Sequence, residues 1–318
     1  MVTTAMRSKS ELTSAIRQHS RAVLVVNIRS RRAAKAHPRL AGLLTAAGLR
    51  LIADLPVIDP ATLPEVLERA LTLSPDLLIF GGGDGSVATA VDFLVYRDVA
   101  LGVLPLGTTN NFARCLGLPL TVDGAVRTIA TGKVADVDLG RVSGAAGEDL
   151  FANLVSLGLS VDVAHRTPHG LKRRIGRAAY ALTGLRVLPR HRPFLATVTT
   201  AAGTETFWTH QLNIANGRFH AGRAIARDAS IDDRHLVIYR LGNQLRRRLS
   251  TAMLVQMLRG ARRDLVSTPF LVTSEVLIRT DPVIGVDVDG EVRGTTPVSI
   301  STAAEALRVL VPRTFVDT

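Results

Sequence analysis

Residues 77–86 read LLIFGGGDGS, an apolar run that passes directly into a glycine-rich turn. Residues 100–111, ALGVLPLGTTNN, repeat this arrangement with a second apolar run and a second turn. Short apolar runs that end at glycine are typical of buried strands, so we expect both turns at the carboxyl ends of strands. Open α/β sheets bind their ligands at that edge. The two turns therefore predict an α/β fold and the position of its binding site.

The first turn has the composition of a phosphate-binding loop. Glycine leaves the backbone free to approach a ligand, and its N–H groups can converge on phosphate oxygens. Asp84 is the unusual member of the turn, because a carboxylate repels phosphate unless Mg²⁺ lies between them or a hydroxyl must lose its proton. The turn therefore indicates phosphoryl chemistry. The alternative is a tight structural turn in which Asp84 caps a helix over residues 86–95.

The composition is that of a globular protein of two domains. The chain has 318 residues, of which 47% are hydrophobic, and this length exceeds that of most single domains. Its apolar runs fall well short of the roughly 18 residues that a membrane span requires, and residues 1–21 lack the apolar core of a signal peptide. The single cysteine, Cys115, allows no internal disulfide and no Cys/His metal cluster. We therefore expect a cytoplasmic protein.

The formal net charge of +12 is carried almost wholly by arginine and predicts an anionic partner. Aromatic residues make up only 4% of the chain, which argues against nucleic acid, because proteins bind single-stranded bases by stacking. Residues 171–186 combine apolar side chains at helical spacing with a basic face. This pattern predicts either a helix docked on an anionic membrane or an ordinary solvated helix. The basic residues of that face are Lys172, Arg173, Arg174 and Arg177.

The pattern of elements changes near residue 135. Residues 21–135 alternate short apolar runs with helical stretches, which predicts a parallel sheet with helices on both faces. Residues 136–302 contain mainly strand-like segments, one of them over 150–159, and predict an antiparallel β-sandwich. Two further helices are expected near 171–186 and 246–261. Residues 303–315 hold one more strand, which is expected to return to the first domain and complete it.

Acidic residues gather at two places in the second half. Residues 287–291, DVDGE, place three carboxylates at the end of an apolar strand, where they could bind Mg²⁺ or act as a general base. The alternative is a hairpin turn, because Asp-Gly between strands favours one. Asp232 and Asp233 precede another strand, and the sequence leaves open whether they bind a cation or cap a loop.

Taken together, these motifs resemble the diacylglycerol kinase catalytic-domain family. The family includes soluble bacterial diacylglycerol kinases, YegS-like lipid kinases, and sphingosine and ceramide kinases. The resemblance covers residues 21–312, and its strength is the order and spacing of the whole set rather than any one motif. The matching segments are GGDGS at 82–86, PLGTTNNFAR at 105–114, VDLG at 137–140, ASIDD at 229–233 and DGE at 289–291.

The resemblance implies an α/β nucleotide-binding domain like that of NAD kinases and phosphofructokinases, a β-rich lipid-substrate domain, and ATP with Mg²⁺ between them. Asp289 or Glu291 would be the catalytic base, and Asp84 competes for that role or for binding Mg²⁺. The residues that would line the nucleotide are Asn27, Gly82, Gly83, Asp84, Gly85, Ser86, Val87, Ala88, Gly107, Thr108 and Asn110. A structural Mg²⁺ site in the soluble bacterial members would correspond to Asp233, Ser230, His235, Asp232 and Asp138.

Two segments depart from the family pattern. The usual Asn-Pro-x-Ser-Gly is here NIRSR at 27–31, without the turn that proline sets and the freedom that glycine allows. The usual Asp-Asp-Gly is here DDR at 232–234, although arginine is poorly suited to a left-handed backbone position. The first departure weakens the case for tight nucleotide binding, and the second weakens the case for the structural Mg²⁺.

The expected function is that of an ATP-dependent lipid kinase, which transfers the γ-phosphoryl group to the hydroxyl of diacylglycerol or a related lipid. Such an enzyme would associate peripherally with the inner face of the membrane, and a homodimer is compatible with the sequence. The alternatives are a kinase for a sphingoid or ceramide-like lipid, an NAD kinase-like enzyme, and a lipid-binding or regulatory protein that has lost catalysis.

Overall fold

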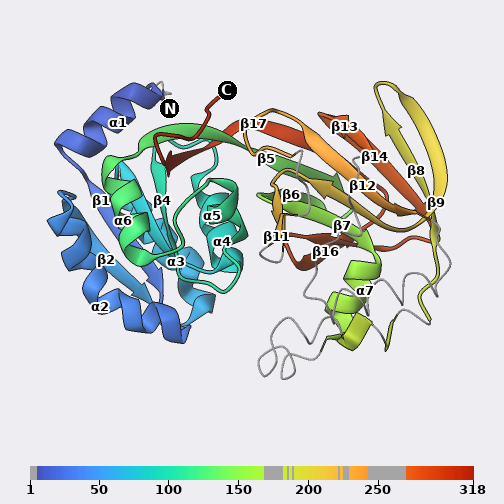
Figure 1. Ribbon diagram of the computed structural model, residues 1–318, viewed down its shortest axis with the longest axis horizontal. Coiled ribbons are helices and arrows are strands. Elements are labelled where there is room, and N and C mark those ends of the chain that lie inside the picture. The colour runs from blue at the N-terminus through green and yellow to red at the C-terminus, as the bar shows by residue number, and fades with distance from the viewer. Residues whose placement is uncertain are drawn as a thin grey trace.

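The computed structural model describes residues 6–167, 182–184, 186–187, 190–220, 223–224, 229–242 and 270–318. The N-terminal half is a layered α/β unit whose central strands are parallel and lie in the order β2-β1-β3-β4 (Figure 1). The strands β3 and β4 are buried along their whole length, because helices cover both faces of the sheet. The strands are β1 (Ala22–Asn27), β2 (Leu51–Val57), β3 (Leu77–Gly82) and β4 (Ala100–Pro105).

Two separate apolar clusters show which helices cover which face. One cluster joins the sheet to α3, α4 and α5, and the other joins it to α1, α2 and α6. Helices α1, α2, α3, α4 and α6 bury apolar side chains at helical spacing, so each buries one stripe. The helices are α1 (Lys9–Gln18), α2 (Arg31–Ala46), α3 (Leu63–Thr72), α4 (Asp84–Leu94), α5 (Asn111–Cys115) and α6 (Val122–Thr131).

The C-terminal half is a curled antiparallel sheet around its own apolar core (Figure 1). Its strands lie in the order β16-β15-β7-β9-β8-β14-β17, and β5 and β6 continue from β17. The strands are β6 (Gly147–Phe151), β7 (Leu154–Gly158), β8 (Phe194–Thr200), β9 (Gly203–Ala215), β12 (Leu236–Gly242), β13 (Leu271–Thr273), β14 (Glu275–Asp281), β15 (Gly285–Val288) and β16 (Glu291–Thr295), with the short pair β10 (Phe219–His220) and β11 (Arg223–Ala224). The fold class expected from the sequence is confirmed.

Two long strands join the halves. The strand β5 (Lys133–Gly144) pairs along its length with β17 (Val298–Val311). Near one end of β17, Val309 pairs in parallel with Leu101 of β4, and near the other end Ile300 pairs with Val276 of β14. This two-stranded ribbon therefore belongs to both sheets, and the predicted domain boundary at residue 135 falls inside β5.

One expected strand was wrong. Residues 150–159 form the end of β6, a break at Ala152 and Asn153, the strand β7 and the start of α7 (Leu159–Arg166). The break occurs because the N–H groups of Ala152 and Asn153 point to the Asp289 carboxylate instead of to a neighbouring strand. The expected helix at 246–261 and the basic side chains Lys172–Arg177 lie outside the described residues. Within the described part of the chain, no helix is both long and apolar enough to cross a membrane.

Candidate functional site

The two glycine-rich turns lie side by side with their backbones in contact. The N–H of Leu106 donates to the carbonyl of Gly82 at 3.0 Å. A Cβ atom on Gly107 would lie 2.5 Å from the Cα atom of Gly83 and 2.8 Å from Oδ1 of Asn110, which is closer than any side chain tolerates. The side chain of Asn110 closes its own turn by bonding both the N–H and the carbonyl of Gly107. Glycine is therefore required where the turns meet.

Asp84 ties the first turn to the second. Its carboxylate accepts the Thr109 hydroxyl, the N–H of Asn111 at 2.5 Å and the N–H of Phe112 at 3.4 Å. The last two donors are backbone N–H groups at the start of α5, where a carboxylate stabilises a helix. The structural alternative from the sequence was therefore wrong about which helix Asp84 caps, because α4 begins at Asp84 itself and Gly83 is its N-cap.

Asn27 keeps its place at the site although the segment after it is altered. It ends β1, and its side-chain amide donates to the Ser86 hydroxyl in the first turn of α4 at 2.9 Å. Ser30 caps α2 by accepting the N–H of Ala33, and Arg31 is the first helical residue. The loss of proline and glycine therefore leaves a regular helix start at the edge of the turns.

Asp289 reaches the same region from the other half of the molecule. It sits in the turn between β15 and β16 with φ of +50°, and its carboxylate accepts the N–H groups of Ala152, Asn153 and Leu154 at 2.7–3.1 Å. Loss of water around the carboxyl raises the pKa of Asp289 to about 6, although these backbone donors favour the charged form. A carboxyl with this pKa can exchange a proton near neutral pH.

Cys115 shows that the acids of the two halves approach one another. It ends α5, and its thiol donates to Oδ1 of Asn153 at 3.8 Å. A Cβ atom on Gly217 would lie 2.8 Å from its sulfur, so α5 packs directly against the C-terminal half. Burial and the charges of Asp289 and Asp84 together raise the pKa of the Cys115 thiol to about 11, although hydrogen bonds with the backbone of Phe219 and Arg218 lower it. Both carboxylates therefore lie close enough to act on one thiol.

Glu291 belongs to a different group of charges from Asp289. Its carboxylate pairs with Arg293 at 3.2 Å, and Arg293 pairs with Asp149 of β6 at 2.8 Å. The Glu291 side chain is 68% exposed. Asp92 of α4 lies near this group. Burial raises the pKa of Asp92 to about 6, and the charges of Arg293, Asp149 and Glu291 also act on it. Asp289 and Glu291 are therefore only two positions apart in sequence, but the first carboxylate is fixed by backbone donors and the second is exposed to water.

Comparison with known protein families agrees with this arrangement. Residues 21–142 match the model described as the diacylglycerol kinase catalytic domain. Residues 153–311 match the model of the YegS C-terminal NAD kinase beta sandwich-like domain. The chain belongs to the diacylglycerol kinase catalytic-domain family of lipid kinases. The resemblance drawn from the motifs is confirmed. The two glycine-rich turns lie in the first matched domain, and Asp289 lies in the second.

Relatives of this kinase family share the fold and part of the sequence. The chain is 31% identical over 175 residues to a protein of Enterobacter sp. (strain 638) named "Probable lipid kinase YegS-like", an alignment that covers 52% of this chain and 56% of the relative. It is 38% identical over 121 residues to the diacylglycerol kinase of Bacillus subtilis (strain 168), covering 37% of this chain and 39% of the relative. The aligned part thus spans about half or less of these relatives. A crystal structure of a diacylglycerol kinase from Bacillus anthracis str. Sterne has the same fold, with a TM-score of 0.74 and 21% identity over 93% of this chain and 98% of that one.

Three of the acids expected at the family's structural Mg²⁺ site accept backbone N–H groups. Asp138 accepts the N–H groups of Arg234 at 2.6 Å and Glu305 at 2.9 Å. Asp233 accepts the N–H of His235, and Asp232 accepts that of Thr318. Within the described ranges, no group of three or more His, Cys, Asp or Glu side chains is arranged to hold a metal ion. The resemblance implies that the backbone carbonyls of Ser230 and His235 would complete such a site beside Asp233, and this structural Mg²⁺ stays a prediction.

Two arginines at the second turn were missed by the sequence analysis. Arg32 of α2 donates to the carbonyls of Gly107 at 3.3 Å and Leu120 at 2.7 Å, and Arg114 of α5 donates to the carbonyl of Thr109 at 2.9 Å. The available signal was a basic residue in the first turn of the helix after β1, next to Ser30. Since many helices begin with exposed arginine, only the contact with Gly107 identifies Arg32 as part of the site.

Proposed function

We propose that this protein is an ATP-dependent lipid kinase that phosphorylates the hydroxyl of diacylglycerol or a related lipid. The observation that carries the proposal is that the two glycine turns of the α/β half and the Asp289 carboxylate of the β half both lie near α5. One side can bind phosphate through backbone N–H groups, and the other can take a proton. A phosphoryl transfer to a hydroxyl needs both.

In this mechanism the main contribution of the protein is to hold the reacting groups in position. The turn residues Gly82 to Ala88, with Gly107 and Thr108, would direct backbone donors at the phosphates, and Asp84 would hold the two turns at a fixed spacing. Mg²⁺ bound with the nucleotide would supply positive charge to the β- and γ-phosphate oxygens. Asn27 would fix Ser86 at the start of α4. By holding the phosphates in place, these groups would reduce the entropic cost of bringing the reacting atoms together.

Among the three candidate bases, the geometry favours Asp289. Asp84 is bound by three donors that fix it between the turns. Glu291 is open to water and paired with Arg293, so its position is not fixed by buried donors as that of Asp289 is. Asp289 combines a fixed position with a raised pKa, so its carboxylate would accept the proton of the lipid hydroxyl as the oxygen attacks phosphorus.

The alternatives make different predictions for the same experiment. The purified protein would be incubated with Mg²⁺, labelled ATP and liposomes that contain diacylglycerol, a sphingoid base or ceramide, and in a parallel reaction with NAD. Transfer to diacylglycerol supports the proposal, and transfer to another acceptor replaces the substrate. ATP binding by calorimetry without any transfer would indicate a protein that has lost catalysis. Absence of both binding and transfer would exclude the kinase function.

A lipid kinase must also reach its substrate in a membrane. We propose peripheral binding at the inner face of the membrane through Lys172, Arg173, Arg174 and Arg177, which lie outside the described residues. Support comes from the basic composition of that segment. Replacing the three arginines by glutamine should weaken sedimentation with anionic liposomes, most clearly at low salt. Equal sedimentation of variant and parent would remove the proposal. A homodimer stays a prediction for ultracentrifugation.

A further inference from the structure

The carboxylate of Asp289 lies in a socket formed by residues 152–154, at the break between β6 and β7. Three consecutive peptide N–H groups of this segment donate to the carboxylate at 2.7–3.1 Å. The N–H of Asp289 donates in return to the carbonyl of Leu154 at 3.0 Å. A break in a sheet leaves peptide groups without strand partners, and buried peptide groups require other partners. The partners of the remaining carbonyls therefore show what holds the socket in place.

Asn216 holds the socket. It follows β9 directly and is fully buried, and its side-chain amide donates to the carbonyl of Ala152 at 3.1 Å and to that of Asp138 at 3.0 Å. The backbone N–H groups of Asn216 and Gly217 both donate to the carbonyl of Asn153 at 3.0 Å. Both amide hydrogens of the Asn216 side chain are thus engaged with carbonyls, which fixes its orientation.

These contacts act on the same peptide units that bind Asp289. The carbonyl of Ala152 and the N–H of Asn153 belong to one planar unit, and the carbonyl of Asn153 and the N–H of Leu154 belong to the next. Asn216 binds the first unit through its side chain and the second through its backbone. Neither unit can rotate without losing a bond at each end. A carbonyl that accepts a hydrogen bond also polarises the N–H of its own peptide, which strengthens the bond to the carboxylate.

We propose that Asn216 is a positioning residue for the phosphoryl transfer, because it fixes the two peptide units that hold the Asp289 carboxylate and so favours the ionised form of this base. The inference rests on the proposed function, in which Asp289 takes the proton of the hydroxyl. Asn216 acts only through backbone groups, so no motif of charged side chains reveals its role.

The first test measures the titration of Asp289 directly and needs no substrate. In protein labelled with ¹³C at the aspartate carboxyl groups, the resonance that is missing from Asp289→Asn identifies Asp289, and NMR follows its midpoint with pH. Asn216→Ala removes the amide donors, so we expect the midpoint to rise by about one pH unit, because hydrogen bonds to the ionised form lower the pKa of a carboxyl. The thiol of Cys115 nearby stays neutral in this range, because its pKa is about 11.

The second test measures turnover with pH. In Asn216→Ala the acidic limb of kcat/KM should move upward with the midpoint of Asp289, and kcat on the plateau should fall about tenfold, because the base is less well held. The KM for ATP should stay near the parent value, because the glycine turns belong to the other half of the molecule.

Gly217→Ala is a second variant in case Asn216→Ala does not fold. A Cβ atom on Gly217 would lie 3.2 Å from the carbonyl oxygen of Ala152 and 3.4 Å from the Cα atom of Asn153. It therefore disturbs the same peptide units without removing the amide. We expect it to move the midpoint of Asp289 in the same direction.

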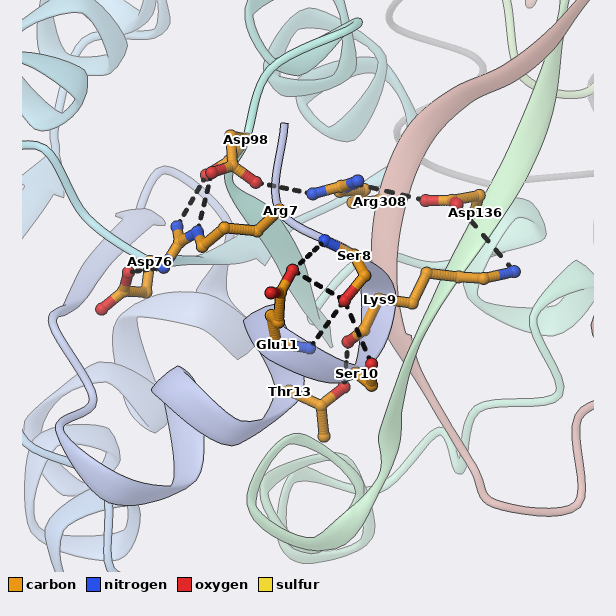
Figure 2. A network of polar contacts seen from close by, with 10 residues as sticks. All are labelled: Arg7, Ser8, Lys9, Ser10, Glu11, Thr13, Asp76, Asp98, Asp136 and Arg308. Carbon is orange, nitrogen blue, oxygen red and sulfur yellow. Dashed lines mark hydrogen bonds and ion pairs between the residues drawn. The ribbon is translucent and has the colours of Figure 1, made fainter. Parts of the chain in front are cut away.

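Arg7→Met is the matched control for a loss of stability without a change at Asp289. The guanidinium of Arg7 pairs with Asp76 and Asp98, each at 2.7 Å (Figure 2). These acids precede β3 and β4, so the pairs lie at the edge of the sheet opposite the glycine turns. The variant should lower the midpoint of thermal unfolding and leave the titration of Asp289 and the kcat/KM profile at the parent values.

Two results would overturn the inference. One is an unchanged midpoint of Asp289 in Asn216→Ala, or in Gly217→Ala if the first variant does not fold. The other is an equal shift in Arg7→Met, which would show that the midpoint reflects loss of stability alone. Failure of the proposed function has a different signature, since the parent protein would then transfer no phosphoryl group to any lipid. The NMR titration would still decide whether Asn216 acts on Asp289.

Discussion

At the scale of single residues, the site separates carboxylates that look alike in sequence. Asp289 is held by three consecutive backbone N–H groups, and Glu291 faces water beside Arg293. Asp84 lies in the middle of the first glycine-rich turn, but its oxygens are occupied by Thr109 and by the start of α5. The surroundings of each acid, more than its position in a motif, decide which chemistry it can perform.

Asp289→Asn removes the proposed base and should lower turnover about 10²- to 10⁴-fold. Binding of ATP, measured by calorimetry, should remain. Because the pKa of Asp289 is raised to about 6 and the base must be unprotonated, the parent's kcat/KM should rise with pH through about 6 and then level off. Glu291→Gln is the matched control and should keep most activity. A loss with Glu291→Gln but not with Asp289→Asn would exchange the two roles.

Arg32 offers a prediction about the nucleotide. Its guanidinium lies on the carbonyl of Gly107 and is exposed, so it adds positive charge where the phosphates are expected. Arg32→Met should raise the KM for ATP about tenfold and change kcat less, since a hydrogen bond to a charged group contributes about 1.5–3 kcal/mol. Arg39→Met, at an exposed position of the same helix, should leave KM unchanged. Equal KM values for both variants would separate Arg32 from the phosphates.

At the scale of elements, two strand-to-helix turns form one surface. The turn after β3 and the turn after β4 are neighbours because the strands pair in parallel, with Gly82 opposite Pro105. The glycines of these turns differ in how much space surrounds them. Gly107 is needed because the backbone of Gly83 is too close for a Cβ atom, whereas a Cβ atom on Gly85 would meet nothing within 4 Å.

This difference gives a matched pair of variants. Gly107→Ala forces the turns apart, so it should lower the free energy of unfolding by about 1–3 kcal/mol and abolish ATP binding. Gly85→Ala should leave the free energy of unfolding nearly unchanged. Denaturant titration measures the stability of both variants, and calorimetry measures ATP binding. If Gly107→Ala binds ATP as the parent does, then the contact between the turns is not part of the nucleotide site.

At the scale of the whole molecule, the ribbon of β5 and β17 joins the parallel strands of the N-terminal half and the antiparallel strands of the C-terminal half into one continuous sheet (Figure 1). A break in the ribbon would remove strands from both halves at once. Gly140 illustrates how tightly it is packed, because a Cβ atom there would lie 2.0 Å from the ring of Phe151. The two halves are therefore expected to depend on each other for stability.

We accordingly predict that the halves unfold together. Helices α1 to α6 lie in the N-terminal half, and the single tryptophan, Trp208, lies on β9 of the C-terminal half. Far-UV circular dichroism and tryptophan fluorescence should therefore report the same midpoint in a denaturant titration. Two separated midpoints would mean that each half is stable alone and that the ribbon does not couple them.

The sequence by itself determined the alternation of strands and helices, the glycine turns after β3 and β4, and the order of motifs that identifies the family. These features are local, since the periodicity of apolar side chains and the backbone freedom of glycine are legible within a few residues. Even the wrong strand over 150–159 is apolar enough to pair. Its break at Ala152 depends on Asp289, which lies 137 residues further along the chain.

Only the tertiary structure decided how distant residues meet. It placed Asp84 on the start of α5, separated Asp289 from Glu291, brought Arg32 to the second turn, and set Lys9 of α1 beside Asp136 of β5. The physical reason is that these contacts follow from strand order and register, which are fixed by the packing of the whole sheet. No local pattern of side chains contains that information.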